Sequence, residues 1–498
     1  MNILDIIDNI KVKTIYGNLP ESVNNISQDS RKVGEGDVFV AIKGYTVDGH
    51  NYIEKVIEQG AALVIASRYD NYNVENCAVI VIKEHEIEKI ASMIAKKINE
   101  GSDVHTVAVT GTNGKTSIST LVHNMLRTLG ESSAYIGTNG FGKNDAEPVY
   151  FGNTTPDVVT LHNQIGELRR DNIKNLAFEA SSHAMALGRI YNVDIDVAIF
   201  TNLTHEHLDF HGDMQTYAYD KSLLFSTLGN NLSDAKYGVL NKDDSYYKVI
   251  SKCLYQQEIN YSIVDETADF YAYNIKQYKE DKVYKTSFTL RSPEGTFECT
   301  TNYIGDFMVS NVLAALIAVW VKGYSVEQLV DILPKLGALY GRMEILGDDL
   351  PIDIISDFAH TPDGYEKLLE ATREIRKGKR TLLVTGMGGG RDISKGPLIG
   401  EIISEADYVV ITTDSPRDED VEVLMGSIEK GMTHKNYEKV WFRTDAVKRI
   451  IELSEPGDVV ILASKGREDY EILQGGKKVW HSDPIVAVEE AKKKFNIK

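Results

Sequence analysis

The stretch Val107-Ala108-Val109-Thr110-Gly111-Thr112-Asn113-Gly114-Lys115-Thr116 decides the fold of the chain around it. Its first four residues form an apolar, β-prone run, and residues 117–128 after it carry apolar side chains near helical spacing. This order predicts a strand, a glycine-rich loop and a helix.

The loop has the composition of a phosphate-binding loop. Glycines allow backbone N–H groups to converge on phosphate oxygens, a lysine supplies positive charge, and a threonine hydroxyl can bind the Mg²⁺ that accompanies a nucleotide. The loop is shorter than the common GxxxxGK[ST] pattern, because Val109 stands where the first glycine would be. A chance glycine-bearing turn before a helix is the alternative. We predict that ATP is held by Gly111, Thr112, Asn113, Gly114, Lys115 and Thr116.

Length and charge limit the class of protein. The 498 residues are too many for one core and predict two to four domains. A net charge of −19 argues against nucleic acid or an anionic membrane as partner. No apolar run approaches the roughly 20 residues of a membrane span, and the first residues lack the basic start of a signal peptide, so we expect a cytoplasmic protein. Three scattered cysteines have no metal-type spacing and are expected to be reduced.

Short apolar runs alternate with helical stretches along the whole chain, which predicts an α/β protein. We expect domains at residues 1–100, 101–330 and 331–498, with a polar linker at 96–103. Strands are predicted at 37–42, 61–66, 78–82, 107–110, 176–179, 197–201, 237–240, 381–385, 408–412 and 458–463.

Polar clusters interrupt this pattern, and two of them directly follow predicted strands, where open α/β sheets place their ligands. They are residues 152–157, 179–184 and 201–211. The third holds three histidines within seven residues, but no cysteine supports a zinc site. A hard-cation site shared with ATP is the better interpretation, with Glu179, a histidine and Thr116 around Mg²⁺. In the first domain, Ser30 and Arg31 could hold a phosphate or uracil edge, or could simply form a polar turn.

Eight motifs in this order resemble those of the Mur ligases, ATP-dependent enzymes that extend the peptide of the bacterial cell-wall precursor. The resemblance is greatest to the MurE branch, which adds the third residue to UDP-N-acetylmuramoyl-L-alanyl-D-glutamate. The motifs span essentially the whole chain and lie at residues 29–31, 110–116, 153–157, 179–183, 201–212, 341–344, 357–363 and 414–417.

The resemblance implies a three-domain architecture with a central P-loop-type domain, a Rossmann-like C-terminal domain and a site residue set. Lys115, Thr116, Glu179 and His207 would act on ATP and Mg²⁺, and Asn311, Arg342 and Asp357 would hold adenine and ribose. The UDP-precursor would be bound by Ser30, Asn153, Thr154, Thr155, Ser181 and Arg189. The incoming amino acid would be bound by Arg391, Asp414, Ser415, Arg417, Ser464 and Glu468.

Lys221 matches the lysine that these enzymes carry as a carbamate. From the residues around it alone, Lys221 would be interpreted as a solvent-exposed lysine on a helix. Reaction with CO₂ would turn its cationic amine into a carboxylate-like metal ligand.

Arg417 bears on which amino acid is added. A guanidinium can bind a second carboxylate through two hydrogen bonds, so we expect meso-diaminopimelate, with L-lysine or another diamino acid as the alternative. The chain departs from the family pattern at Leu187, Met308, Gly390, Ser415, Ser464 and Arg467. Arg467 is a further arginine expected near this pocket.

The implied reaction forms an acyl phosphate on the γ-carboxylate of D-glutamate, which the amine of the amino acid then attacks. No side-chain nucleophile is needed, and we expect a monomer whose C-terminal domain closes over the central one. Two other interpretations remain: a related ligase such as folylpolyglutamate synthetase, which the 29–31 motif argues against, and a non-catalytic paralogue that senses the precursor. The intact set of Lys115, Glu179, His207 and Lys221 argues against the second.

Overall fold

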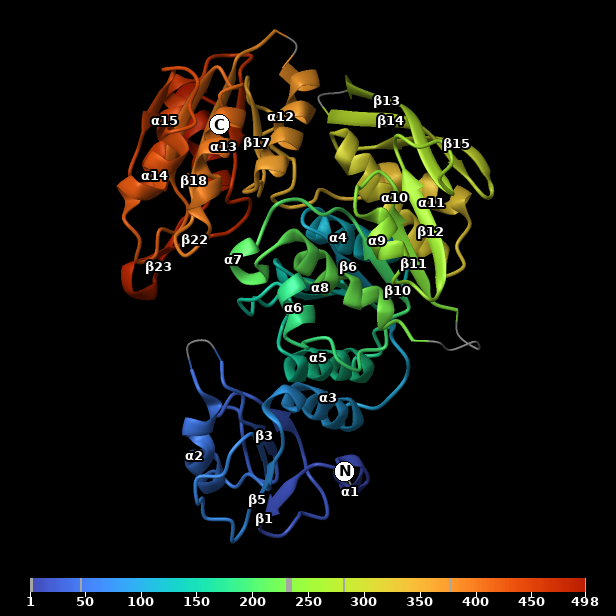
Figure 1. Ribbon diagram of the computed structural model, residues 1–498. Coiled ribbons are helices and arrows are strands. Elements are labelled where there is room, and N and C mark those ends of the chain that lie inside the picture. The colour runs from blue at the N-terminus through green and yellow to red at the C-terminus, as the bar shows by residue number, and fades with distance from the viewer. Residues whose placement is uncertain (1–2, 45–46, 230–234, 281–282, 377, 498) are drawn as a thin grey trace.

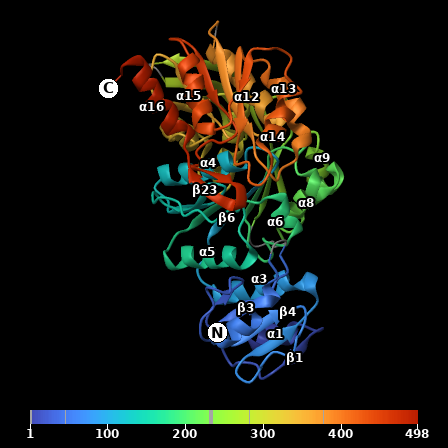
Figure 2. The same ribbon diagram turned by 90° about the vertical axis from the view of Figure 1, so that its left-hand side faces the viewer.

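The computed structural model describes residues 3–44, 47–229, 235–280, 283–376 and 378–497. Three α/β domains follow one another along the chain, each with its own sheet, so the predicted fold class is confirmed (Figure 1). Seen from two directions, the N-terminal domain lies at one end of the molecule, and the C-terminal domain at the other (Figures 1 and 2).

The N-terminal domain is a five-stranded sheet in the order β1-β5-β4-β3-β2, parallel except for β1. Its elements are α1 (Leu4–Asn9), β1 (Thr14–Tyr16), β2 (Ile26–Ser27), β3 (Val38–Val40), α2 (Ile53–Glu58), β4 (Leu63–Ala66), β5 (Ala78–Val81) and α3 (Ile87–Ile98). The three predicted strands appear as β3, β4 and β5. The predicted linker begins too early, because Lys96 and Lys97 belong to the last turn of α3, where cationic side chains favour the helix dipole.

The central domain is built on a ten-stranded sheet in the order β15-β14-β13-β12-β11-β10-β6-β9-β7-β8. Its strands are β6 (His105–Thr110), β7 (Ser133–Gly137), β8 (Gly140–Lys143), β9 (Asn175–Glu179), β10 (Val197–Phe200), β11 (Tyr237–Asn241), β12 (Gln257–Ser262), β13 (Phe270–Glu280), β14 (Val283–Ser292) and β15 (Gly295–Thr301). Its helices are α4 (Lys115–Thr128), α5 (Val158–Arg170), α6 (Ser182–Ala186), α7 (Leu208–His211), α8 (Met214–Ser226), α9 (Tyr247–Ser251), α10 (Asp306–Trp320) and α11 (Val326–Ile332).

Strand β6 lies inside this sheet, parallel to both β10 and β9, and the predicted phosphate loop joins it to α4. Separate apolar clusters cover the two faces of the sheet, one formed with α4 and α10 and the other with α5 and α8. Because both faces are buried, β6 and its neighbours are continuous apolar runs rather than alternating ones.

The antiparallel strands β13, β14 and β15 extend the sheet at one edge and were not predicted (Figure 1). This extension reaches the C-terminal domain. Lys279 Nζ lies 2.9 Å from Asp353 Oδ1, and the Tyr284 hydroxyl donates to Asp353 Oδ2 at 2.8 Å. The extension therefore provides a contact between the two domains that is separate from the covalent linker.

The C-terminal domain has a six-stranded sheet in the order β16-β17-β21-β18-β19-β20, parallel except for β16. Its strands are β16 (Glu344–Leu346), β17 (Asp353–Ser356), β18 (Thr381–Met387), β19 (Tyr408–Thr413), β20 (Tyr437–Lys439), β21 (Val459–Leu462) and the separate hairpin β22 (Tyr470–Leu473) and β23 (Lys477–Trp480). Its helices are α12 (Pro362–Arg376), α13 (Gly396–Ile403), α14 (Val421–Glu429), α15 (Arg443–Leu453) and α16 (Asp483–Phe495).

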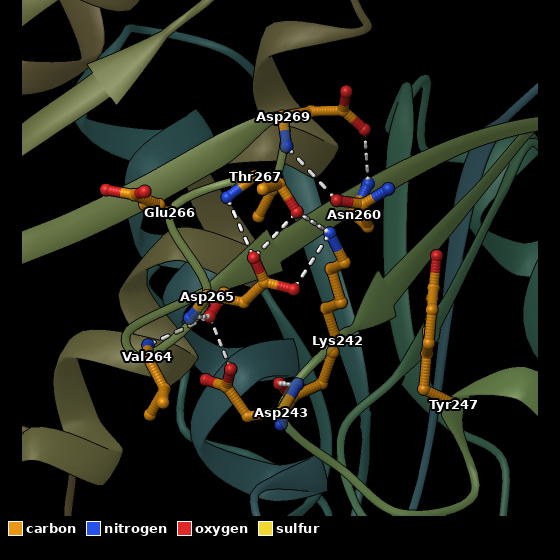
Figure 3. Close-up of polar contacts among 12 residues, drawn as sticks. Lys242, Asp243, Tyr247, Asn260, Val264, Asp265, Glu266, Thr267 and Asp269 are labelled. Atoms are coloured by element: carbon orange, nitrogen blue, oxygen red, sulfur yellow. Dashed lines mark hydrogen bonds and ion pairs between the residues drawn. The ribbon is translucent and has the colours of Figure 1, made fainter.

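Loops at the ends of β11 and β12 are fixed by their own hydrogen bonds (Figure 3). Asp243 accepts from Ile263 N at 2.9 Å, Lys242 pairs with Asp265 at 3.0 Å, and Asp269 accepts from Asn260 N at 2.8 Å. Asp243 also lines a cavity next to the phosphate loop, so these hydrogen bonds fix the position of one side of that cavity. Across the described parts of the chain, we find no helix with the length and apolar character needed to span a membrane.

Candidate active site

A cavity of about 420 Å³ lies between the central and C-terminal domains. Loops after β6, β9 and β10 meet loops after β18, β19 and β21 there, since the carboxyl ends of parallel strands share one edge of a sheet. Most of the predicted residues line it: Thr112, Asn113, Gly114, Lys115, Thr116, Asn153, Thr154, Thr155, Glu179, Ser181, Arg189, His207, Lys221, Arg342, Arg391, Asp414, Ser415, Arg417, Ser464 and Glu468.

The phosphate loop is held against the segment that follows β10. Asn202 accepts from Thr112 N through its carbonyl at 2.9 Å, and from Asn113 N through its side chain at 2.8 Å. Gly114 has φ +88° and directly precedes α4, a conformation that side-chain-bearing residues rarely adopt. The loop is thus pre-shaped at a helix N-terminus, where an anion is stabilised.

Two lysines share one carbonyl at this loop. Lys115 Nζ lies 2.9 Å and Lys221 Nζ 2.8 Å from the carbonyl oxygen of Gly111. Burial lowers the pKa of Lys115, and burial together with the charge of Lys115 lowers the pKa of Lys221 well below its usual value. The alternative interpretation of Lys221 as a solvent-exposed helix lysine is wrong, because its side chain is buried.

Glu179, Thr116 and His207 provide the donor types that suit Mg²⁺. Glu179 is buried and accepts from Thr138 N at 2.8 Å, while the Thr116 hydroxyl accepts from Arg342 at 3.0 Å. Burial, followed by the charges of His183, Lys115 and Lys221, lowers the pKa of His207 to about 2, so its imidazole is neutral and keeps a lone pair.

These donors fit Mg²⁺ only as a partial shell. Among the residues whose positions are described, no three His, Cys, Asp or Glu side chains are grouped closely enough to hold a metal. Mg²⁺ in proteins usually keeps several waters and binds substrate phosphate oxygens as well, so Thr116, Glu179 and His207 would supply only part of its ligands. The other two histidines of the cluster lie elsewhere: His205 is exposed, and His211 is buried between Asp220 and Ser182, at 2.7 and 2.9 Å.

Residues expected to bind the UDP-precursor divide into two places. Thr155 accepts from Ser181 N at 3.1 Å, and its carbonyl accepts from Arg189 at 3.0 Å, which ties these residues together at the end of β9. Ser30 lies in the N-terminal domain and lines neither cavity. Its neighbour Arg31 pairs with Asp29 at 2.9 Å.

A second cavity of about 500 Å³ adjoins the first across the phosphate loop. Asn311, Arg342 and Asp357 line it, and Arg342 and Gly114 line both cavities. Asp357 accepts from Met343 N and Ala359 N, each at 2.7 Å. A nucleotide could therefore place its base and ribose here and its phosphates in the first cavity.

Behind the expected amino-acid pocket lies a buried lysine, Lys465, that was not among the predicted site residues. Lys465 Nζ lies 3.1 Å from Asp414 Oδ1 and 3.5 Å from Glu468 Oε2. Burial, followed by the charge of Asp414, raises the pKa of Glu468. The two carboxylates therefore repel each other even with Lys465 between them. A charged residue three positions after the end of β21 was the available signal for Lys465.

Two arginines behave differently from expectation. Arg467, the further arginine expected near the pocket, does not line the first cavity, and its guanidinium binds Glu344 through two hydrogen bonds. Arg417 lines the cavity but already donates to the Gly389 carbonyl. Ser415 accepts from Ile472 N at 3.2 Å, and Ser464 accepts from Arg443 at 2.8 Å, so both hydroxyls support the loops.

Backbone strain concentrates around the first cavity. Apart from glycine and asparagine, the described residues with positive φ are His207, Met343, Ser415, Arg417 and Ser464. Four of them line the first cavity, and Met343 follows Arg342. Such conformations cost on the order of 1–3 kcal/mol each and cluster at functional sites.

Sequence reasoning also missed an ion pair between the domains. Lys395 Nζ lies 3.0 Å from Glu206 Oε1, with side chains only 8% and 10% exposed. Glu206 directly precedes His207, and Lys395 follows the glycine-rich loop after β18. In both cases a charged residue next to a recognised motif was the feature of the sequence that could have indicated the pair. A further contact joins the Tyr150 and Tyr470 hydroxyls at 2.8 Å.

Comparisons with known proteins agree with this geometry. Models of the Mur ligase family catalytic domain, the Mur ligase middle domain and the Mur ligase glutamate ligase domain match residues 22–101, 109–319 and 341–466. UDP-N-acetylmuramoyl-L-alanyl-D-glutamate–L-lysine ligases are 42% identical: that of Staphylococcus haemolyticus (strain JCSC1435) over 99% of both chains, and that of Staphylococcus aureus (strain MW2) over 98% of this chain and 97% of the relative. A solved UDP-N-acetylmuramoyl-L-alanyl-D-glutamate–2,6-diaminopimelate ligase superposes with a TM-score of 0.68 at 28% identity, covering 99% of each chain.

The chain belongs to the Mur ligase family. Within that family it is similar to the MurE-type enzymes, and it is an ATP-dependent acid–amino-acid ligase.

Proposed function

We propose that this ligase joins L-lysine to the γ-carboxylate of D-glutamate in UDP-N-acetylmuramoyl-L-alanyl-D-glutamate, with cleavage of ATP. The observation that carries the reaction is the cavity where the phosphate loop, the end of β9 and the C-terminal loops meet. A cytoplasmic location follows from nucleotide-linked substrates.

The choice of lysine replaces our expectation of meso-diaminopimelate. The 42% identical relatives carry the name of the L-lysine ligase, whereas the diaminopimelate ligase is 28% identical. Arg467 is paired with Glu344 and does not line the cavity, and Arg417 already has a carbonyl partner, which weakens the case for a second substrate carboxylate. Asp414 and Glu468 both line the cavity, where burial and then the charge of Asp414 raise the pKa of Glu468, and a lysine ε-ammonium would pair with these carboxylates.

Mg²⁺ would be held by Thr116, Glu179, His207 and, as a carbamate, Lys221, and would neutralise charge on the phosphate oxygens. Because the pKa of Lys221 is lowered, its amine is more readily neutral, which is the form that reacts with CO₂. A lysine that stayed cationic beside Lys115 would instead oppose metal binding.

In the proposed reaction the γ-carboxylate of D-glutamate attacks the γ-phosphorus of ATP, and ADP leaves. Lys115 offsets the charge that develops on the transferred phosphoryl group. Thr155, Ser181 and Arg189 orient the precursor, while Asp414 and Glu468 orient lysine. The neutral α-amine then attacks the acyl phosphate, and an amide forms as inorganic phosphate leaves and the amine loses a proton.

The test is phosphate release by the purified protein with ATP, Mg²⁺ and UDP-N-acetylmuramoyl-L-alanyl-D-glutamate. L-Lysine, L-ornithine or meso-diaminopimelate is added in turn, and the product is identified by its mass. We expect turnover with lysine. Turnover with diaminopimelate alone would reject the lysine assignment and keep the ligase, while no turnover with any of the three would reject the proposed substrate set.

A further inference from the structure

Arg467 binds Glu344 in a geometry that fixes both side chains. Arg467 Nε donates to Glu344 Oε2 at 2.8 Å, and Arg467 Nη2 donates to Oε1. The Glu344 side chain is only 5% exposed, and it also accepts from Gly341 N at 2.8 Å. The guanidinium lies 5.1 Å from the ring centroid of Tyr340. One carboxylate therefore ties the loop after β21 to residues 340–344, which join the central domain to the C-terminal sheet.

The two backbones touch at the same point. Gly341 has φ +68°, and a Cβ atom there would lie 2.7 Å from the backbone nitrogen of Arg467. A Cβ atom on Gly466 would lie 3.1 Å from the Gly341 carbonyl oxygen. The two backbones are therefore packed against each other without space for a side chain between them.

Each partner is next to a residue that faces a substrate site. Arg342, two residues before Glu344, donates to Thr116 at 3.0 Å and lines both cavities. Glu468 directly follows Arg467 and lines the first cavity near Lys465. The ion pair thus lies between the residue that reaches the nucleotide loop and a residue of the amino-acid pocket.

We propose that the Arg467–Glu344 ion pair couples nucleotide binding at Arg342 to the placement of Glu468 for the incoming amino acid, which makes both residues positioning residues. This inference rests on the proposed function. An arginine suits the role because two parallel hydrogen bonds fix the direction of the carboxylate as well as its distance. A histidine at this position could make only one of those bonds.

The test uses the full chain with Arg467→His, Arg467→Lys and Glu344→Gln, the last of which keeps an acceptor for Gly341 N. The matched control is Arg373→His, which removes another two-bond arginine–carboxylate pair, with Glu405, in the same domain. We expect KM for lysine to rise about tenfold in the three variants, with KM for the UDP-precursor unchanged and the control unaffected. The double variant Arg467→His/Glu344→Gln should lose no more than either single one.

A second measurement is independent of the amino acid. Amide hydrogen exchange of residues 464–468 is followed with and without Mg²⁺ and a non-hydrolysable ATP analogue. We expect the analogue to protect this loop in the wild-type chain and the control but not in the Arg467 variants. Equal protection in Arg467→His, no protection in the wild-type chain, or a similar rise in every KM would overturn the coupling. If no amino acid is used at all, the proposed function fails, and the exchange result still decides the coupling.

Discussion

Close packing around the phosphate loop makes individual side chains there decisive. A Cβ atom on Gly111 would lie 1.7 Å from Thr201 Oγ1, and one on Gly114 would lie 2.8 Å from Asn311 Oδ1. Thr201 in turn donates to the Asn113 carbonyl at 2.6 Å. The loop therefore has no spare volume, and its shape depends on glycine at both positions.

Gly114→Ala should raise KM for ATP and lower kcat, because the added methyl group displaces the Asn311 side chain from the second cavity. Gly130→Ala is the matched control, since Gly130 has nearly the same φ, +87°, but nothing within 4 Å. Both changes carry a conformational cost of about 1–2 kcal/mol, seen as a lower melting temperature. Only the Gly114 variant should lose ATP affinity; equal losses in both would show that backbone strain alone is responsible.

Lys115→Ala should lower kcat by about 10²–10³-fold or more, because it removes the positive charge that we propose offsets the charge on the transferred phosphoryl group. The fold should persist, since burial already lowers the pKa of Lys115 and its charge therefore costs rather than contributes stability. Phosphate release and a thermal melt measure the two effects. Near-normal turnover would contradict the role given to Lys115.

Among the elements, α15 and α16 are joined by a fully buried ion pair. Arg443 and Asp483 side chains are both 0% exposed, and Arg443 Nε lies 3.1 Å from Asp483 Oδ1. His481 also contacts this carboxylate, at 2.5 Å. Burial alone would raise the pKa of Asp483, but Arg443 and His481 hold it far below the usual range. Arg443 reaches Ser464 as well, so the pair supports a loop of the site from beneath.

Asp483→Asn should destabilise the fold by about 3–5 kcal/mol at neutral pH, because it leaves Arg443 buried without a counter-charge. The folded-state pKa of Asp483 is lowered, so the wild-type pair contributes its full stability above the ordinary value of 3.8. That contribution is lost as the pH falls below 3.8 toward the folded-state pKa. Urea unfolding from pH 7 to pH 3 measures this.

The control for that experiment is Glu490→Gln, which breaks an exposed pair with Lys493 on the same helix and should cost at most about 1 kcal/mol. An Asp483→Asn variant that lost stability in the same way as this control would show that the buried pair is not a major contributor.

Element prediction succeeded where one short apolar run made one strand. Strands β18, β19 and β21 are buried on both faces and bounded by polar loops, so their signal is local. The extension β13–β15 was missed because much of its outer half is exposed and carries lysines such as Lys276 and Lys279, which look like loop residues. Its partners are other strands, and a single segment does not reveal them.

The site was predictable up to the direction of side chains. Most of the expected residues line one of two adjoining cavities, because their motifs follow parallel strands. The partner of Arg467 could not be predicted, because Glu344 is 123 residues away and the position of Arg467 beside Glu468 does not show which group its guanidinium binds. Lys465 was overlooked for the same reason: its two carboxylates identify it only in three dimensions.

At the scale of the molecule, the central and C-terminal domains meet through charges that lie inside the cavity. Lys395 and Glu206 are both nearly buried, and Asn113 of the phosphate loop donates to Asp363 at the start of α12 at 2.8 Å. These contacts exist only while the domains are together, so they favour the closed arrangement that we expect to precede the reaction.

Lys395→Met should lower kcat at least about tenfold, because Glu206 would then be buried without its partner whenever the domains close. Lys395→Arg should recover most of the activity. Lys439→Met is the control, since Lys439 pairs with Glu422 and Glu429 inside one domain. Small-angle scattering should give a larger radius of gyration for Lys395→Met than for the control, and equal radii with normal kcat would argue against a role in closure.

The contact of Asp353 with Lys279 and Tyr284 gives the C-terminal domain a second attachment beside its covalent linker. A body held at one point can tilt and spin in any direction, whereas a body held at two points can only rotate about the line that joins them. Because of the β13–β15 extension, we expect the C-terminal domain to rotate about a single axis that runs through the linker and the Asp353 contact. Each opening and closing should therefore return Asp414 and Glu468 along the same arc to the same place above the phosphate loop.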